Sequence, residues 1–567
     1  MSVRPRAHRS GVTALLFSIA VAHGAAANAA SVGGVNGAVA AEHRLASQAG
    51  VEILRAGGNA VDAAVAALLA SGVVNPSSSG LGGGGFMLVY VAKSASVHAI
   101  DFRESAPASA TRDMFVRDGR VDEAAAKRGG LAVAVPAEPR GFAHALARYG
   151  SMPFAAVAAP AIRLARDGFD VEAHTADALA RHRAELAADP ALATELLQPD
   201  GSPYRAGERM NRPALAATLE GLSRDGIESF YVGELANDLV TAVRAGGGIL
   251  TAADLAAYRV VERPPIMTRY RGLRVAGMPP PSSGGGVIAT ALAILEAYRL
   301  GDLDDDTPTY EHLLAETLKA AFADRARDYG DPDFTRVPLA RLISPARATA
   351  IRARFSAVRP LPAATYGTLA RVPNDAGTAH VSVIDAAGNA VACTSSVNTA
   401  FGAKLGVRGI VLNNTMDDFS LQPGVPNAYG LIGNEANSIS ARKRPLSSMS
   451  PTIVLDAAGV RLAAGASGGP LIISATLQTV LDVVDFDLDV GDAVAAARVH
   501  HQWLPDVLTV EERLPATTQL SLERRGHTLR RIPSLAAVQA VEQLRAGGET
   551  RVFAASDARK GGVAAAY

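Results

Sequence analysis

The chain has 567 residues, enough for a large buried core and, by length alone, for two to four domains. Lysine plus arginine and aspartate plus glutamate number 55 each, and charged residues make up only 19% of the chain. Without a net charge or a basic run, the chain lacks the electrostatic signature of proteins that bind nucleic acid or acidic membranes. The single cysteine, Cys393, excludes an intramolecular disulfide and a metal site built from several cysteines.

The first thirty residues have the pattern of an export signal. Three arginines lie within the first nine residues, a mostly apolar run covers 11–22, and small residues fill 25–30. This order is typical of a Sec-type signal peptide. We therefore expect residues 1–30 to be removed and the protein to be periplasmic or secreted, with an uncleaved signal anchor as the alternative. No later apolar run reaches the roughly 18 residues that a membrane span needs, so none is expected in the mature chain.

Two helices and a glycine run come next. Residues 42–55 have helical spacing and end at a glycine pair, and Asn59 is placed to cap an alanine-rich helix over 60–71. The run at 80–85 contains G-x-G-x-x-G, but a dinucleotide site needs a strand before this motif and a helix after it. Here the order is helix, glycines, strand, which argues against a nucleotide cofactor.

A second predicted strand, 98–104, contains Arg103 close to its end. A guanidinium there is either a surface charge or a clamp that binds a carboxylate with two hydrogen bonds. The middle of the chain, 141–354, is mainly helical by spacing and is interrupted by an irregular Pro/Ser/Gly-rich loop at 278–286.

Residues 377–398 predict a β-hairpin. Two β-rich runs, 377–385 and 389–398, are joined by Ala386-Ala387-Gly388, with glycine where a positive φ is needed. If the strands pair across a three-residue loop, Thr378 faces Ser396, and Asn398 lies on the same face. A slip of one residue would turn that face over.

Thr378 has two interpretations. A small residue, Gly377, directly before a threonine that opens a strand is typical of a bond that is cut to make a new N-terminus. A free α-amine has a reference pKa of about 7.7–8.0 and can accept the proton of its own side-chain hydroxyl near neutral pH. The alternative is that Thr378 simply pairs in a sheet.

The remainder predicts a strand over 409–412, a long loop over 423–444 of the kind that forms lids, and strands over 452–455 and 460–464. A helix from residue 472 follows a glycine pair, Gly468 and Gly469. Their backbone amides could form an oxyanion hole, because no side chain blocks approach, or the pair could serve only as a tight turn.

Nine segments, in this order, resemble the γ-glutamyltranspeptidases (glutathione hydrolases), which are N-terminal-nucleophile hydrolases. The segments are GGNAVDAA (57–64), LGGGGFM (81–87), DFRE (101–104), PPPSSGG (279–285), GDPDF (330–334), GTAH (377–380), LNNTMDDF (412–419), RPLSSMSPT (444–452) and HHQWLP (500–505). The resemblance implies an α+β protein with a four-layer αββα sandwich, made as a zymogen that cuts itself between Gly377 and Thr378. A large subunit, 31–377, and a small catalytic subunit, 378–567, would together form one αββα unit.

The resemblance also implies a role for each matching residue. Thr378 would be the nucleophile and its amine the base, with Ser396 where the family has a hydroxyl, usually threonine, that binds the nucleophile. The matching positions for the substrate's α-carboxylate are Arg103, Ser447 and Ser448; for its α-ammonium, Asn398 and Asp418; for the oxyanion, Gly468 and Gly469; and for the lid aromatic, Tyr429. Thr415 stands where the family commonly has a longer Gln or Glu that contacts the α-ammonium.

The implied reaction is attack of Thr378 on a γ-glutamyl amide such as glutathione, followed by transfer of the acyl group to water, an amino acid or a peptide. No metal or organic cofactor is implied. Because Thr415 is short, a glutaryl- or cephalosporin-type acylase of the same fold remains an alternative, although Asp418 has no use in a substrate without an α-ammonium. A third possibility is an unprocessed, catalytically silent binding protein.

Overall fold

A computed structural model describes residues 31–367, 377–423 and 433–567. The predicted signal peptide, 1–30, and the predicted lid residue Tyr429 lie outside these ranges. No helix in the described ranges is long and apolar enough to cross a membrane.

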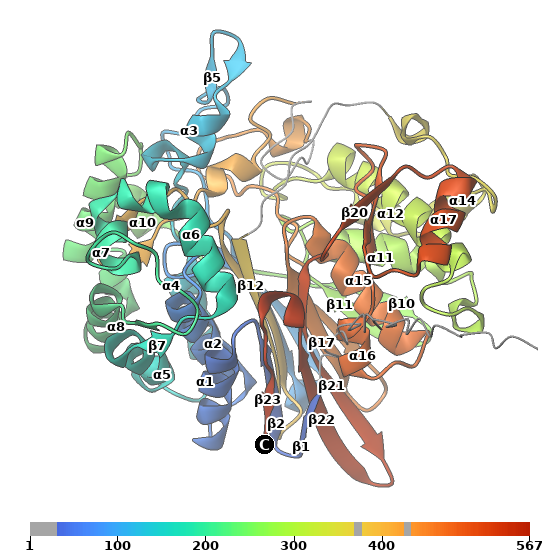
Figure 1. Cartoon of the computed structure of the whole chain (residues 1–567), viewed down its shortest axis with the longest axis horizontal. Coiled ribbons are helices and arrows are strands. Elements are labelled where there is room, and N and C mark those ends of the chain that lie inside the picture. Colours follow the sequence, from blue (N-terminus) through green and yellow to red (C-terminus); the bar gives the residue numbers. More distant parts are fainter. Residues whose placement is uncertain (1–30, 368–376, 424–432) are drawn as a thin grey trace, which may run out of the picture.

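Two seven-stranded sheets form the centre of the molecule (Figure 1). In spatial order the first contains β1 (Val32–Gly34), β22 (Glu549–Ser556), β21 (Ala537–Ala546), β17 (Val460–Ser467), β16 (Thr452–Leu455), β11 (Leu273–Gly277) and β10 (Ile266–Tyr270). The second contains β23 (Ala565–Ala566), β2 (Gly37–Ala41), β12 (Gly377–Asp385), β13 (Ala390–Asn398), β3 (Gly84–Val91), β4 (Ser96–Phe102) and β9 (Val261–Arg263). Neighbouring strands in both sheets are antiparallel.

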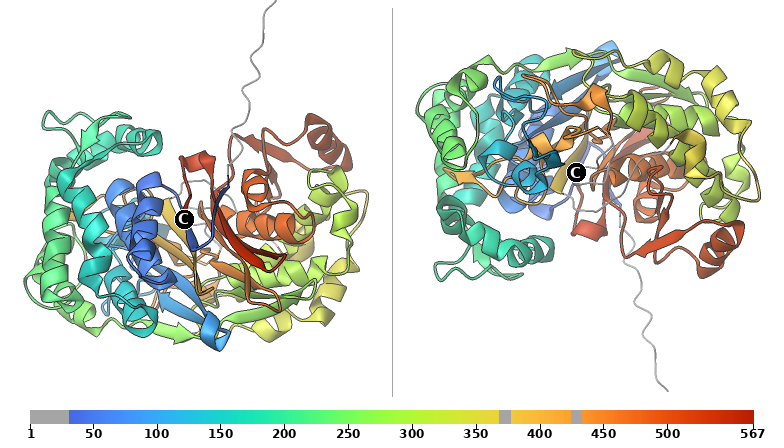
Figure 2. Two further views of the ribbon diagram at one scale, coloured as in Figure 1. Left: turned by 90° about the horizontal axis from the view of Figure 1, so that it is seen from below. Right: turned by 90° about the horizontal axis from the view of Figure 1, so that it is seen from above.

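Helices cover the outer face of each sheet, as Figures 1 and 2 show. On the side of the second sheet lie α1 (Arg44–Arg55), α2 (Ala60–Val74), α4 (Glu138–Tyr149), α5 (Phe154–Asp167), α6 (Ala173–Ala187), α7 (Pro190–Leu196), α8 (Pro213–Asp225), α9 (Glu234–Ala245) and α10 (Ala252–Ala257). On the side of the first lie α11 (Gly284–Leu295), α12 (Pro308–Asp328), α14 (Pro345–Arg352), α15 (Leu471–Val484), α16 (Val490–Ala495) and α17 (Ala516–Arg525). The expected four-layer αββα arrangement is confirmed.

Side-chain alternation along β12 explains the layers. Val381 and Val383 belong to the core shared with the helices, whereas Ile384 belongs to the core between the two sheets. Ser382 also faces the other sheet, where its hydroxyl donates to the Gln539 carbonyl at 3.0 Å. Successive residues of a strand point to opposite faces, so β12 contacts both cores.

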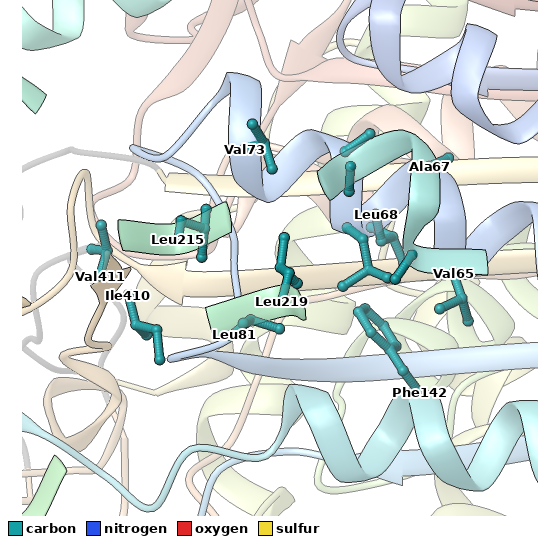
Figure 3. Packing of buried hydrophobic residues seen from close by; sticks show 14 of the residues in the cluster. Val65, Ala67, Leu68, Val73, Leu81, Phe142, Leu215, Leu219, Ile410 and Val411 are labelled. Atoms are coloured by element: carbon teal, nitrogen blue, oxygen red, sulfur yellow. The ribbon is translucent and has the colours of Figure 1, made fainter. Parts of the chain in front are cut away.

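Helix α2 anchors the helical layer behind the hairpin. Asn59 caps it as predicted, with Asp62 completing a capping box. All fifteen of its residues are buried, which is expected of a helix that is apolar on every side. Figure 3 shows Leu68 of α2 near Leu219 of α8 and Phe142 of α4, in a cluster that extends to Ile410 and Val411.

The part predicted to be mainly helical, 141–354, is so, but it also contains five strands: the short pair β7 (Phe169–Asp170) and β8 (Arg209–Met210), and the sheet strands β9, β10 and β11. Strands β10 and β11 pair through a two-residue turn, Arg271-Gly272, in which both residues have positive φ. Such a turn suits the twist of a hairpin, so Arg271-Gly272 is the part of the sequence from which this hairpin could have been predicted.

Candidate active site

The hairpin of β12 and β13 has the predicted register over most of its length. Residues 379–384 pair with 395–390, and the Asp385 amide donates to the Asn389 carbonyl at 3.0 Å. Gly388 in the loop has φ +79°, which glycine adopts without steric cost. At the other end the register shifts between Gly377 and Ala379, so that Thr378 lies opposite two residues of β13.

This bulge brings polar groups together at the Gly377–Thr378 bond. Thr378 Oγ1 lies 3.3 Å from Ser396 Oγ, and the Ser396 hydroxyl donates to the carbonyl oxygen of Gly377. The amide of Asn398 donates to the same Ser396 oxygen at 2.8 Å. Because the one proton of Ser396 is directed at the Gly377 carbonyl, the Thr378 hydroxyl is the donor in its contact with Ser396.

Glycines at and just before the start of β3 allow close contact with β13. A Cβ atom on Gly83 would lie 2.1 Å from the Ser396 carbonyl oxygen, and one on Gly85 would lie 2.1 Å from that of Thr394. Only residues without a side chain allow this segment to lie against the strand that carries Ser396.

Two buried arginines, Arg103 and Arg325, lie among the residues at the predicted carboxylate-binding position. Arg103 follows β4 directly and is 1% exposed. Arg325, near the end of α12, donates to Ser283 Oγ at 2.9 Å and to Ser448 Oγ at 3.4 Å. Burial lowers the pKa of Arg325 to about 10, so it remains charged at neutral pH.

Arg325 is missing from the residues predicted from the sequence. It continues the buried face of α12 formed by Leu314, Leu318 and Ala321, at helical spacing. An arginine on an apolar helix face is the signal that could have found it, because a buried guanidinium requires polar partners.

The residues predicted to bind an ammonium group lie beside these. The guanidinium of Arg103 contacts the carboxylate of Asp418, so side chains assigned to opposite ends of a substrate form one ion pair. Burial raises the pKa of Asp418, and the charge of Arg103 opposes that shift. Asn398 Nδ2 donates to the Asn414 carbonyl at 3.0 Å.

Thr415 lies behind this ion pair. Its hydroxyl donates to Glu104 Oε1 at 2.8 Å, and Arg103 Nη1 lies 3.2 Å from the other oxygen of Glu104. Burial raises the pKa of Glu104, with the charge of Arg103 opposing the shift. Thr415 is fully buried and outside the cavity lining, so in this arrangement it is linked to the cavity through Glu104 and Arg103.

The glycine pair lies where β17 meets α15. Gly468 and Gly469 have φ values of +136° and +58°, which favour glycine. Their carbonyls accept from the amides of Leu471 and Ile472 at 3.2 Å. Because N–H and C=O point in opposite directions in a trans peptide, the Gly469 amide points away from α15.

One small cavity joins most of the predicted residues. It encloses about 20 Å³, room for about one water molecule. Gly377, Thr415 and Gly468 are the predicted residues of the described ranges that are not in its lining. The lining consists of Arg103, Arg325, Thr378, Ser396, Asn398, Asp418, Leu446, Ser447, Ser448, Met449, Gly469 and Ile472.

Within residues 31–367, 377–423 and 433–567, no group of three or more histidine, cysteine, aspartate or glutamate side chains is placed to hold a metal ion.

Similarity to known proteins agrees with this arrangement. The glutathione hydrolase proenzyme of Escherichia coli (strain K12) is 42% identical over 527 residues, which are 92% of this chain and 90% of that protein. The acylase ACY 1 proenzyme of Pseudomonas sp. (strain V22) is 39% identical over 515 residues, 89% of each chain. The crystal structure of cephalosporin acylase from Bacillus halodurans superposes with a TM-score of 0.82 at 28% identity, covering 95% of this chain and 97% of that one.

The family model described as Gamma-glutamyltranspeptidase matches residues 46–567. This match extends over nearly the whole chain and includes both strands of the hairpin, and the chain therefore belongs to the γ-glutamyltranspeptidase family.

Proposed function

We propose that the protein is a γ-glutamyltransferase and glutathione hydrolase that acts through a γ-glutamyl ester of Thr378. The observation that carries the proposal is the cavity in which the Thr378 hydroxyl faces Arg103 and Asp418. A γ-glutamyl group has a carboxylate and an ammonium on its α-carbon, and these two side chains offer the complementary charges. Ser447, Ser448 and Arg325 add donors on the carboxylate side, and Asn398 lies on the ammonium side.

The proposal begins with self-cleavage. Thr378 Oγ1 attacks the carbonyl carbon of Gly377, and the Ser396 hydroxyl stabilises negative charge on the carbonyl oxygen. Breaking the Gly377–Thr378 C–N bond leaves an ester on Thr378 and frees its α-amine, which takes up a proton. Water then hydrolyses the ester to give the large subunit, 31–377, and the small subunit, 378–567.

Turnover repeats this chemistry on an external amide. The α-amine accepts the proton of the Thr378 hydroxyl, the oxygen attacks the γ-carbonyl carbon, and the amides of Gly468 and Gly469 stabilise the oxyanion. The proton then passes to the leaving amine. Glutathione or another γ-glutamyl compound is the donor, and water, an amino acid or a peptide takes the acyl group. The proposal includes export by a signal peptide over 1–30.

A second candidate is an acylase for glutaryl-type amides. It is favoured by the similarity to the two acylases and by Thr415, which offers the cavity no ligand for an ammonium group. Turnover of γ-glutamyl-p-nitroanilide and of glutaryl-p-nitroanilide, which keeps the carboxylate but lacks the α-ammonium, separates the two candidates. We expect the γ-glutamyl compound to have the higher kcat/KM, and the reverse order would support the acylase.

A further inference from the structure

Strand β2 ends before it reaches the nucleophile. Its pairing with β12 runs from Gly37 opposite Asp385 to Ala41 opposite Val381, after which the chain turns into α1. Alternate residues of an antiparallel strand direct both N–H and C=O toward the same neighbour. Between Thr378 and Val381, the backbone groups of β12 that face the β2 side therefore need partners other than a strand.

Two charged side chains supply these partners. Lys560 Nζ donates to the Thr378 carbonyl oxygen at 2.9 Å and to Glu42 Oε2 at 3.1 Å. The other oxygen of Glu42 accepts from the His380 amide at 3.3 Å. The Lys560 side chain is 12% exposed and that of Glu42 1%, so this pair, the Lys560–Glu42 clamp, is largely shielded from solvent.

We propose that Lys560 is a positioning residue for the N-terminal threonine: it holds the Thr378 backbone and keeps the freed α-amine in its neutral, basic form. The inference rests on the proposed function, because only a cut before Thr378 creates that amine.

Geometry places the amine on the side of Lys560. In an extended strand the nitrogen and carbonyl oxygen of one residue face the same side. They are three bonds apart, about 2.7–3 Å when they face the same side, so Lys560 Nζ would lie within roughly 6 Å of the Thr378 nitrogen. A positive charge at such a distance disfavours a second one and lowers the pKa of the amine below its ordinary value.

Glu42 acts in the opposite direction, but from farther along the strand. Its carboxylate is bonded to Lys560 and to the amide of His380, whereas Lys560 is bonded to Thr378 itself. The net effect of the clamp is therefore to lower the pKa of the amine.

Other charged or titratable groups surround this position. His380 and His174 are neutral, because burial lowers the pKa of each to about 3. Across the cavity the charges of Arg103 and Asp418 oppose each other in their ion pair. Among the described charged residues, Lys560 is the one with a side-chain hydrogen bond to Thr378. The charged or titratable groups on the neighbouring elements include Glu42, Arg103, Glu104 (beside Arg103), Glu138 (behind Ser395), His174, Arg325, His380, Asp418 and Lys560.

The test compares Lys560→Met, Lys560→Arg and Glu42→Gln with the unmutated protein. Lys93→Met, in the exposed turn after β3, is the matched control. A denaturing gel first records which variants are cut. The pH dependence of kcat/KM for γ-glutamyl-p-nitroanilide then gives the pKa of the base in the free enzyme.

A base is active when deprotonated, so activity falls as pH drops through its pKa. This falling part of the pH profile is its acidic limb. In Lys560→Met we expect this acidic limb to move up by about one pH unit, with an approximately tenfold loss on the limb itself. Lys560→Arg should keep the limb near its original position, Glu42→Gln should move it down, and Lys93→Met should leave it unchanged.

An unchanged limb in a cut Lys560→Met protein would overturn the role of Lys560. If Lys560→Met stays uncut, Glu42→Gln decides: an acidic limb that does not move down in Glu42→Gln would overturn the role of Lys560. An unmutated protein that stays a single, inactive chain would contradict the proposed function, and with it this inference. If the unmutated protein is cut and active but the acidic limb of the variants does not shift, only the role of Lys560 is contradicted and the proposed function stands.

Discussion

Arg325 illustrates how single residues complete the site. Its guanidinium reaches the cavity from α12 and donates to Ser448, one of the residues assigned to the substrate's α-carboxylate. A hydrogen bond to a charged group contributes about 1.5–3 kcal/mol, which corresponds to roughly 10- to 100-fold in affinity. We therefore expect Arg325 to contribute to the selection of a γ-glutamyl donor.

Arg325→Met should raise KM for γ-glutamyl-p-nitroanilide by about 10- to 100-fold. The loss should be much smaller for 4-aminobutyryl-p-nitroanilide, which lacks the α-carboxylate. Arg327→Met is the control, since that half-exposed side chain contacts Asp324 and Asp328 on the same helix. Equal losses with both substrates would remove Arg325 from carboxylate recognition.

Glu138 is a second residue whose importance only the structure reveals. It opens α4, is 1% exposed, and accepts a hydrogen bond from Ser395, the neighbour of Ser396. Burial raises the pKa of its carboxyl from 4.5 to about 8. The folded protein therefore binds a proton at Glu138 more tightly than the unfolded chain does.

This pKa predicts a pH-dependent stability. Glu138 favours folding fully below about pH 4.5, and that contribution is lost as pH rises toward 8. Glu138→Gln resembles the protonated form, so its stability relative to the parent should grow by on the order of 3 kcal/mol between pH 5 and pH 8. Urea unfolding of uncut Thr378→Ala protein measures this, with exposed Glu549→Gln as the control. Parallel pH curves for parent and Glu138→Gln would contradict the shift.

At the scale of elements, the sequence predicts what depends on local pattern. Alternation and Gly388 indicate the hairpin, and its predicted register is confirmed from Ala379 to the loop but not at Thr378. Asn59 indicates the start of α2, which is confirmed. The bulge at Thr378 was not predictable, because it depends on contacts of β13 with distant segments such as the loop at Ser78.

The site required the family resemblance as well as local pattern. Arg103 and Asp418 are 315 residues apart, and nothing in either segment by itself indicates that they meet. Local pattern also could not show that the Thr415 hydroxyl is directed at Glu104, because burial of both side chains results from tertiary packing. The assigned roles of these residues remain predictions.

The contact between the glycine run and β13 is testable by substitution. In Gly83→Ala the new Cβ would meet the Ser396 carbonyl at 2.1 Å, and we expect a loss of about 3 kcal/mol or more in stability together with slower self-cleavage. Gly221→Ala, in the interior of α8 with open space around it, should instead stabilise by up to about 1 kcal/mol. Thermal unfolding compares them, and an unaffected Gly83→Ala protein would contradict the close packing.

At the scale of the whole molecule, both sheets are built from both sides of the proposed cleavage point. In the second sheet β12 and β13 lie between β2 and β3, and in the first β16 pairs with β11. Separating residues 31–377 from 378–567 would require breaking these ladders and all three sheet-based cores. After the proposed cut, the two fragments would therefore stay together as one folded unit.

We expect cut protein to elute from gel filtration as one species that contains both fragments in equal amounts, even after dilution. Denaturant should be needed to separate the fragments, because both contribute side chains to the same hydrophobic cores. Elution of either fragment by itself under native conditions would contradict the interleaved sheets.

The most direct test of the account is the identity of the new N-terminus. Mass spectrometry of the purified, unmutated protein should find two fragments, the shorter beginning at Thr378, and Thr378→Ala should stay a single chain. An unmutated protein that remains one chain, or a cut at any other bond, would contradict the assignment of Thr378 as the nucleophile.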